Sequence, residues 1–385
     1  MNKFAQNMLA EYGKRFSTLP QLYFSPGRIN LIGEHVDYND GFVMPAAISK
    51  GIYYAIALNG GKEINFYSHD FGEAYTTGAN DIHKEDNWKN YVLSVVNEFK
   101  LLGVEIVGFD CVFGGDIPRG SGMSSSAALE GGLALALNEL LGSDLTRIQL
   151  ALLCQRAEHG YPAVQCGIMD QFANMMGRKG QVILLDCQSM NHVYIPLQIE
   201  GYQIVLLNSK VHHTLAASEY NLRRKQCKEG LEIIGRHTEV KSFRDINGVE
   251  ELLQYKTVMR DEVYRRCLYV VEEINRTKLA SKYLHENRLI EFGRLLYETH
   301  NGLRDLYEVS CEELDFLVRI AEADDAVIGA RLMGGGFGGC TINIIAENSV
   351  ARFIQSVSEA YYKKYNILPE ATVVETSDGV SRLEG

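Results

Sequence analysis

The sequence contains no apolar run of the ~18 residues that a membrane-spanning helix needs, and it contains no paired-cysteine motif. Its amino-terminal segment has Phe4, Met8, Leu9 and Tyr12 at helical spacing, without the apolar core of a signal peptide. The eight cysteines include no C-x-x-C pair and no zinc-finger spacing, which is typical of free, mostly buried thiols in a reducing compartment. We therefore expect a cytoplasmic protein that does not bind to a membrane.

Basic side chains are also scarce. The 38 lysines and arginines are outnumbered by 49 aspartates and glutamates, which gives a formal charge of −11. This balance argues against nucleic acid as a partner but leaves room for a small anionic ligand. A length of 385 residues with 46% hydrophobic side chains favours about two folded domains over disorder. We expect a monomer, and the sequence leaves an oligomer open.

Repeats, low-complexity tracts and Pro/Ser-rich linkers are absent as well. The hydrophobic spacing predicts β-like segments up to about residue 76, a strand around 109–113, and strands near 181–186, 191–196 and 202–208. It predicts helices at about 2–17, 87–102, 124–141 and 145–160, a mainly helical stretch over 216–323, and then strand, glycine loop, strand, helix and strand up to 375. This order favours an α+β fold over a doubly wound one. We divide the chain into domains 1–200 and 201–385.

Glycine, in contrast, is abundant, with 36 residues, and two segments are especially rich in it. In the first, residues 114–132, a strand is followed by glycines and then by Ser124, Ser125 and Ser126 at the start of a helix. Ser124 is a candidate N-cap, and the free N–H groups of a helix N-terminus favour an anion such as phosphate. Gly120 is followed by Ser121 rather than by lysine, so this is not a P-loop. A capped turn without a ligand is the alternative.

The second cluster is GGGFGG at residues 334–339. It formally satisfies G-x-G-x-x-G, but the residues that follow, 340–344, are typical of a strand rather than of the helix that a dinucleotide site requires. The alternative to a ligand-binding loop is a tight turn packed against a bulky neighbour.

A polar cluster near the amino terminus contains Arg28, Glu34, His35 and Asp37 within ten residues. Closely spaced carboxylates beside a histidine can chelate a metal ion or accept hydrogen bonds from the hydroxyls of a sugar. The cluster lacks the second histidine or cysteine of a tight transition-metal site, so a polyol is favoured. A solvated turn is the alternative.

These three segments together resemble one family. GRINLIGEHVDYNDGFVMPAAI, PRGSGMSSSAALE and LMGGGFGGC are similar to the three motifs of the galactokinase family, within the GHMP small-molecule kinase superfamily. The resemblance extends over essentially the whole chain. It departs from the usual pattern at Met123, where leucine is common, and at residues 163–165, which precede Cys166 near the expected sugar wall.

The resemblance implies a two-domain GHMP kinase fold. Its N-terminal domain would have a mixed sheet with a left-handed βαβ unit, its C-terminal domain would be ferredoxin-like, and the active site would lie in the cleft between them. The implied reaction transfers phosphate from ATP to D-galactose and gives α-D-galactose 1-phosphate and ADP, the first committed step of galactose catabolism. The implied cofactors are ATP and Mg²⁺.

The resemblance also implies a role for each matching residue. Asp170 would be the catalytic carboxylate beside the anomeric hydroxyl, and Arg28 would favour its ionised form and stabilise transferred charge. The sugar hydroxyls would be held by Glu34, His35, Asp37, Gly167 and Tyr220. The nucleotide would be bound by Trp88, Tyr91, Gly120, Ser121, Gly122, Met123, Ser124, Ser125, Ser126, Ala127, Gly335 and Gly336. The Mg²⁺ ligands would be Ser125, or a neighbouring serine, and Glu158.

Three questions stay open at this point. Asp170 can act as a true base or only as a positioner of the hydroxyl. A related sugar kinase that acts on N-acetylgalactosamine or L-arabinose can share the EHVDY segment. A catalytically silent sugar sensor would have lost phosphate-loop or base residues, whereas this chain keeps Ser124, Asp170 and Arg28.

Overall fold

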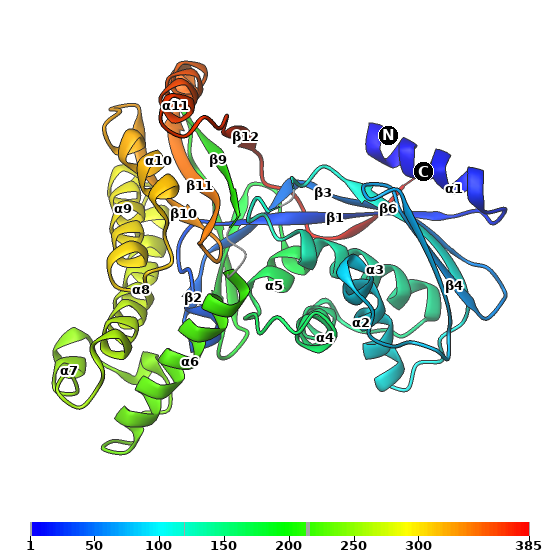
Figure 1. Cartoon of the computed structure of the whole chain (residues 1–385), viewed down its shortest axis with the longest axis horizontal. Helices are drawn as coiled ribbons and strands as arrows, with labels where there is room; N and C mark the ends of the chain where they lie inside the picture. Colours follow the sequence, from blue (N-terminus) through cyan, green and yellow to red (C-terminus); the bar gives the residue numbers. More distant parts are fainter. Residues whose placement is uncertain (1, 119, 213–215, 385) are drawn as a thin grey trace.

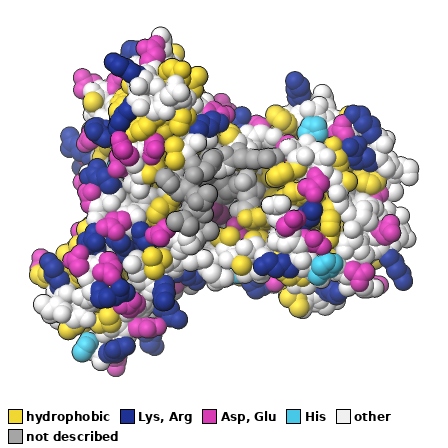
Figure 2. All heavy atoms as spheres, viewed as in Figure 1, with side chains coloured by type: hydrophobic (Ala, Val, Ile, Leu, Met, Phe, Trp, Pro, Cys, Tyr) yellow, Lys and Arg dark blue, Asp and Glu magenta, His cyan; other side chains and the backbone are white. Residues whose placement is uncertain are grey.

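Two lobes, each centred on a β-sheet, meet in the middle of the molecule (Figure 1). The computed structural model describes residues 2–118, 120–212 and 216–384. On the face shown in Figure 2, basic and acidic side chains are interspersed, so neither sign of charge dominates that face.

The N-terminal lobe is built on a six-stranded sheet with the order β13-β1-β3-β6-β4-β5. Its pairs are antiparallel except for β4 and β6, which run parallel and make the sheet mixed. The strands are β1 (Gln21–Asn30), β3 (Pro45–Leu58), β4 (Glu63–Ser68), β5 (Glu73–Gly78), β6 (Phe109–Gly115) and β13 (Ser381–Leu383). One face of this sheet is covered by α1 (Lys3–Arg15), and the other by α2 (Asn87–Leu101), α3 (Ser125–Leu141) and α4 (Arg147–Gly160) (Figure 1).

Strand β6 shows how the sequence pattern produces this arrangement. Phe109, Cys111 and Phe113 alternate on one side and pack into the core that α2 and α3 share. The intervening Val112 faces α1, in a small cluster with Met8 and Tyr12. The predicted alternation is therefore confirmed, and α1 buries the second face as well.

A smaller, three-stranded sheet packs against strand β3 of this lobe. It consists of β2 (Phe42–Val43), β7 (Gln181–Asp186) and β8 (His192–Pro196) in the order β2-β7-β8. The short helix α5 (Met169–Met176) precedes β7 and β8 in the chain and packs against α3 and α4.

The C-terminal lobe contains an antiparallel sheet with the order β10-β11-β9-β12. Its strands are β9 (Tyr202–His212), β10 (Val327–Met333), β11 (Gly338–Ala346) and β12 (Glu370–Val374). The helices around it are α6 (Ala216–Gly235), α7 (Val249–Leu253), α8 (Asp261–His285), α9 (Leu289–Asp305), α10 (Glu312–Glu322) and α11 (Val350–Tyr365). Single 3-10 turns lie at Asp37–Asn39, Phe243–Asp245 and Glu347–Ser349.

The two lobes share a hydrophobic core. In β9, Val205 and Leu207 pack against α10 and α11, whereas Leu206 faces the opposite way. Leu206 belongs to a cluster that also contains Ile29 of β1 and the neighbouring Leu31. This shared cluster fixes the two lobes relative to each other on either side of the cleft between them.

The α+β prediction is confirmed, and the predicted strands and helices are present within a few residues. Helix α5 is not among the predicted elements. The division at residue 200 stays a prediction; the chain passes from β8 to β9 near it, while β13 returns to pair with β1 in the N-terminal sheet. All eight cysteines are free and six are buried, as expected. In the described ranges, no helix is long and apolar enough to cross a membrane.

Candidate active site

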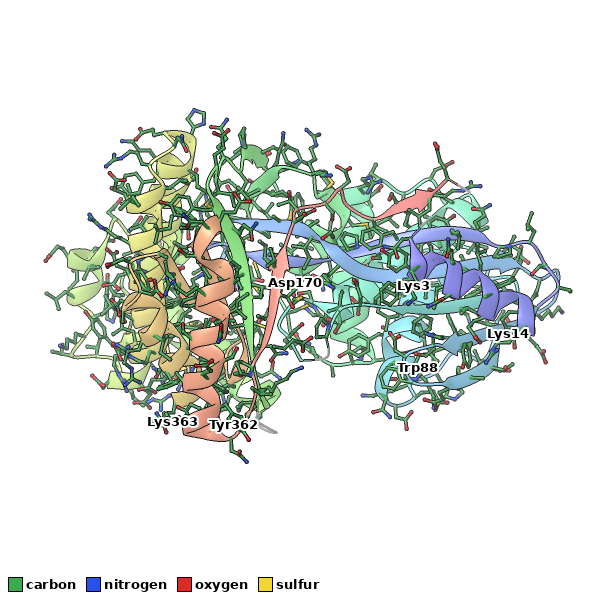
Figure 3. The ribbon with its side chains drawn as sticks, turned by 90° about the horizontal axis from the view of Figure 1, so that it is seen from above. Lys3, Lys14, Trp88, Asp170, Tyr362 and Lys363 are labelled. Carbon is green, nitrogen blue, oxygen red and sulfur yellow. The ribbon has the colours of Figure 1, made fainter. Side chains whose placement is uncertain are left out.

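A cavity of about 150 Å³ lies where the two lobes meet. Figure 3 shows Asp170 at this junction. Its walls come from β1, the loop after it, α4, α5, α6 and the second glycine loop. The lining residues are Arg28, Glu34, His35, Asp37, Glu158, Val164, Cys166, Gly167, Met169, Asp170, Tyr220, Gly334 and Gly335. The structure therefore brings together all seven residues that we expected at the sugar and the reacting hydroxyl.

Arg28 and Asp170 form a bidentate ion pair in this cavity. Nε of Arg28 donates to Oδ1 of Asp170 at 2.8 Å, and Nη2 donates to Oδ2 at 2.7 Å. Arg28 lies in β1 and is 5% exposed, so its charge is desolvated and needs a partner. Although burial acts in the opposite direction, the carboxylates of Asp170 and Glu34 raise the pKa of Arg28. The guanidinium is therefore a permanent cation at this position.

Ser124 differs from its expected role as a side-chain cap. It occupies the N-cap position of α3, but its backbone is left-handed (φ 56°) and its side chain makes no capping hydrogen bond. In this conformation the hydroxyl donates to Oδ2 of Asp170 instead. The residue thus links the phosphate-loop segment directly to the expected catalytic carboxylate.

Glu34 is held by Arg331, a residue that the sequence analysis did not identify. Arg331 lies in β10, is fully buried, and donates from Nη1 to Oε1 of Glu34 at 3.0 Å. Its other N–H groups donate to main-chain oxygens that include that of Leu31, at 2.8 Å. Oε1 of Glu34 also accepts from the amide of Gly334 at 2.7 Å. The single arginine in an otherwise apolar strand was the signal that could have revealed this contact.

His35 is fixed as a neutral imidazole in one tautomer. Its Nε2 lies 3.2 Å from the carbonyl oxygen of Gly335, which can only accept, so Nε2 carries the proton. Nδ1 then accepts from the hydroxyl of Tyr38 at 2.7 Å, and Tyr38 in turn lies 2.9 Å from the hydroxyl of Tyr307. Burial lowers the pKa of His35 to about 3. The ring of Tyr220 packs against it at 5.3 Å.

The carboxylate of Asp37 packs directly against Gly167 in the wall of the cavity. A Cβ atom on Gly167 would lie 2.0 Å from Oδ2 of Asp37, so only glycine leaves room for the carboxylate. Burial, together with the charges of Asp170 and Glu34, raises the pKa of Asp37 to about 7. A group that donates hydrogen bonds to this carboxylate would stabilise its charged form.

Glu158 and its surroundings suit a magnesium ion. Glu158 is 5% exposed and accepts from Nε2 of Gln171 at 2.6 Å. Burial, and next the charge of Asp170, raise its pKa to about 7. Among the described residues, no three His, Cys, Asp or Glu side chains surround one point. Magnesium at phosphate sites takes only one or two protein oxygens and fills the remaining positions with water and phosphate, so one buried carboxylate that accepts from the hydroxyl of Ser126 fits it.

A second cavity, of about 320 Å³, continues from the start of α3 into the N-terminal lobe. Trp88, Tyr91, Ser125 and Ser126 line it. The indole N–H of Trp88 donates to Glu73 at 2.9 Å, which orients the ring. Figure 3 places Trp88 in this lobe, away from Asp170. The geometry provides an apolar slot that ends at the serine run.

The two glycine loops lie against each other. Cβ atoms built on Gly334 and Gly339 would lie 3.6 Å and 3.4 Å from the carbonyl oxygens of Gly122 and Gly120, respectively. Gly120 and Gly122 both have positive φ values, of 66° and 71°. The hydroxyl of Ser121 is buried and has no hydrogen-bond partner within the described part of the chain, and Ser121 lines neither cavity.

Seven of the twelve residues expected at the nucleotide line neither of these two cavities: Gly120, Ser121, Gly122, Met123, Ser124, Ala127 and Gly336. The side chains of Met123 and Ala127 are each 1% exposed and belong to the core. Gly336 is in neither lining; its φ of 78° and the carbonyl of Val309, 2.2 Å from a Cβ built there, account for glycine at this position. These three residues contribute backbone or packing.

Known proteins are similar to this chain in sequence and in structure. The galactokinase galactose-binding signature matches residues 10–58, and the GHMP kinase N-terminal and C-terminal domains match 90–178 and 280–363. A galactokinase of Thermosipho africanus is 38% identical over 94% of this chain and 99% of its own, and one of Bacillus subtilis is 37% identical over 95% of each.

Comparison with solved structures points to the same family. The crystal structure of Lactococcus lactis galactokinase complexed with galactose covers 98% of this chain and 99% of its own, at 34% identity and a TM-score of 0.95. A mevalonate kinase at 19% identity, with a TM-score of 0.62, shares the fold alone. The chain therefore belongs to the galactokinase family of the GHMP kinases.

Proposed function

We propose that the protein transfers the γ-phosphoryl group of ATP to the anomeric hydroxyl of D-galactose, which gives α-D-galactose 1-phosphate and ADP and begins galactose catabolism. The observation that carries the proposal is the Arg28–Asp170 pair, which lies in a cavity bordered by sugar-type acceptors and beside two glycine loops. Phosphoryl transfer depends mostly on positioning and on charge stabilisation, and this arrangement supplies both.

Asp170 has one position left for the reacting hydroxyl. Its Oδ2 accepts from both Arg28 and Ser124, whereas its Oδ1 accepts from Arg28 alone. A carboxylate oxygen has two lone pairs, so Oδ1 can accept one further hydrogen bond. The anomeric O–H donates there and loses its proton to Asp170 as the oxygen bonds to phosphorus and the bond to ADP breaks. Arg28 then stabilises the charge that develops.

The sugar is held by groups from both lobes. Glu34 and Asp37 accept from hydroxyls, and Gly167 leaves the space that the Asp37 carboxylate occupies. Because Arg331 and the Gly334 amide already occupy Oε1 of Glu34, its Oε2 is the oxygen that faces the sugar. Tyr220 closes this side of the cavity.

The nucleotide lies along the apolar slot and the glycine loops. Trp88 and Tyr91 contact the adenine, and the amides of residues 120–126 surround the phosphates. Glu158 and Ser125 would hold Mg²⁺, which would neutralise phosphate charge. This arrangement needs no P-loop lysine.

Two alternatives give different results in one assay. ADP release is measured with D-galactose, N-acetylgalactosamine and L-arabinose. The proposal predicts the highest kcat/KM for D-galactose. A higher value for another sugar would establish a different sugar kinase, and no release with any sugar would establish a sensor.

We also propose that the protein works in the cytoplasm as a monomer. The free, mostly buried thiols support a reducing compartment. A single species of about 43 kDa in light scattering would agree with a monomer; a species of twice that mass would refute it.

A further inference from the structure

Another cavity, of about 360 Å³, lies directly behind the wall of the sugar cavity. Residues that are adjacent in the chain line different cavities, one the sugar cavity and the next the rear cavity. Asp37 and Cys166 face the sugar cavity, whereas the adjacent Tyr38 and Gln165 face the rear one. Helix α6 forms the opposite wall of this rear cavity.

The rear cavity is positively charged in a strongly acidic protein. Its lining contains three cations, Arg224, Lys225 and Lys228, and one carboxylate, Asp40. Lys225 and Lys228 are exposed, and Lys228 lies 3.9 Å from its nearest salt-bridge partner, Glu232. These ammonium groups can therefore turn towards an anion at little cost.

The remaining walls favour an organic anion over a bare ion. Leu231 and Phe243 provide apolar surface, and Ser242, Asn39 and Asn221 provide polar groups. A small phosphate ester would match both parts of the lining, with its phosphate group at the lysines and its short hydroxylated tail along Phe243. The cavity is also larger than a phosphate ion alone requires.

Arg224 connects the rear cavity to the segment that forms the wall of the sugar cavity. Its Nη1 donates to the carbonyl oxygen of Gln165 at 2.5 Å and lies 3.4 Å from that of Cys166, immediately before Gly167. Its guanidinium also lies 5.6 Å from the ring centre of Tyr38, which holds His35. An anion in the rear cavity would attract Arg224 away from these carbonyls and loosen the segment that positions Gly167 against Asp37.

We infer that the rear cavity binds a small phosphate ester and that its binding weakens the binding of the sugar. The kinetic consequence rests on the proposed function, whereas the binding does not. Because the ester contacts α6 rather than the phosphate loop, it raises the KM for galactose and leaves the KM for ATP unchanged.

The test uses glycerol 3-phosphate as the probe, at constant ionic strength. Calorimetry compares the parent, the variant Lys225→Gln/Lys228→Gln, and the control Lys282→Gln/Lys363→Gln, which makes the same charge change on α8 and α11 (Figure 3 labels Lys363). The parent and the control should bind the ester, and the Lys225/Lys228 variant should bind it roughly tenfold more weakly. Saturating ester should raise the KM for galactose several-fold in the parent and the control.

Other outcomes overturn the inference at a defined step. Equal binding by the Lys225/Lys228 variant, or no binding to the parent, would refute the site. Equal affinity for inorganic phosphate would refute the ester, and binding without a rise in KM would refute the coupling. If calorimetric binding follows the predicted pattern while no sugar supports ADP release, the site stands and the proposed function fails.

Discussion

At the scale of single residues, Asp170 carries the largest expected effect. Replacing it with Asn removes the proton acceptor and leaves the Arg28 cation without its anionic partner. We expect Asp170→Asn to lower kcat by about 10²–10⁴-fold while galactose still binds. ADP release and calorimetric sugar binding measure the two effects. The control is Asp144→Asn, an exposed left-handed position where asparagine is well tolerated. Turnover near that of the parent would refute the assignment.

A substitution at Gly167 tests the geometry of the wall of the sugar cavity. In Gly167→Ala the new Cβ atom would displace the Asp37 carboxylate, because the two would lie 2.0 Å apart. We expect the KM for galactose to rise ~10–100-fold, with a smaller change in kcat. Gly13→Ala is the control, since a Cβ atom there meets no other atom within 4 Å. An unchanged KM in Gly167→Ala would show that Asp37 does not hold the sugar.

Asp37 also predicts a pH dependence of stability. Burial raises its folded-state pKa to about 7 from its ordinary value near 4, so between these values the native state keeps a proton that the unfolded chain has released. This contribution to stability is therefore lost as the pH rises through about 7. Asp37→Asn, which does not titrate, should gain stability over the parent at pH 8 and gain much less at pH 5, as measured by urea unfolding. An equal difference at both pH values would contradict the raised pKa.

At this scale the motif residues could be predicted, and their partners could not. The cluster of Arg28, Glu34, His35 and Asp37 is close in sequence, so one segment reveals it. Arg331 is 297 residues away from Glu34 and becomes its partner only when β10 packs against the loop after β1. The hydroxyl of Ser124 likewise turns to Asp170 because the backbone there is left-handed, which the serine run alone does not indicate.

At the scale of elements, the buried pair of Arg331 and Glu34 joins strand β10 to the sugar-binding loop. Arg331→Met leaves the Glu34 carboxylate buried without its partner, and we expect a loss of about 3–5 kcal/mol in the free energy of unfolding. Adding Glu34→Gln should recover part of this loss, because the uncompensated charge is removed.

An exposed pair provides the matched control for this substitution. Arg352 lies 2.8 Å from Asp324 with its side chain 57% exposed, so Arg352→Met should cost at most about 1 kcal/mol. Urea unfolding measures all three variants. Equal losses in the Arg331 and Arg352 variants would show that Arg331 does not hold the loop.

Long elements were predictable, and short ones fixed by tertiary contacts were not. Helices α2, α3 and α4 have 14 to 17 residues, and α3 is apolar along most of its length. Helix α5 has only eight residues, and its end is held from outside by Arg147, whose Nη1 donates to the carbonyl of Met175 at 2.7 Å. The same Nη1 donates to Val380 at 2.9 Å, which helps to bring β13 back to the N-terminal sheet.

At the scale of the whole molecule, the shared core predicts a single cooperative unit. Ile29 and Leu31 of one lobe pack in one cluster with Leu206 and Ile342 of the other, and β13 joins the chain end to β1. We expect one calorimetric unfolding transition, with van't Hoff and calorimetric enthalpies in a ratio of about one. Two separate transitions would show that the lobes unfold independently.

The net charge and the two glycine clusters can be related to phosphate binding only when the whole molecule is considered. The charge of −11 argued against polyanions, yet a phosphate site can be built from loop amides and one metal ion rather than from many basic side chains. The two glycine clusters are more than 190 residues apart in sequence and adjacent in the structure.

The central claim is that phosphate is transferred to the hydroxyl beside Asp170. The most direct measurement is the ³¹P NMR spectrum of the product formed from ATP and galactose labelled with ¹³C at C1. The account predicts one new phosphate ester whose ³¹P signal is coupled to the labelled carbon and, through three bonds, to the anomeric proton of an α-glycosyl phosphate. An ester without the coupling to the anomeric proton, from phosphate on another hydroxyl, or no ester at all, would contradict it.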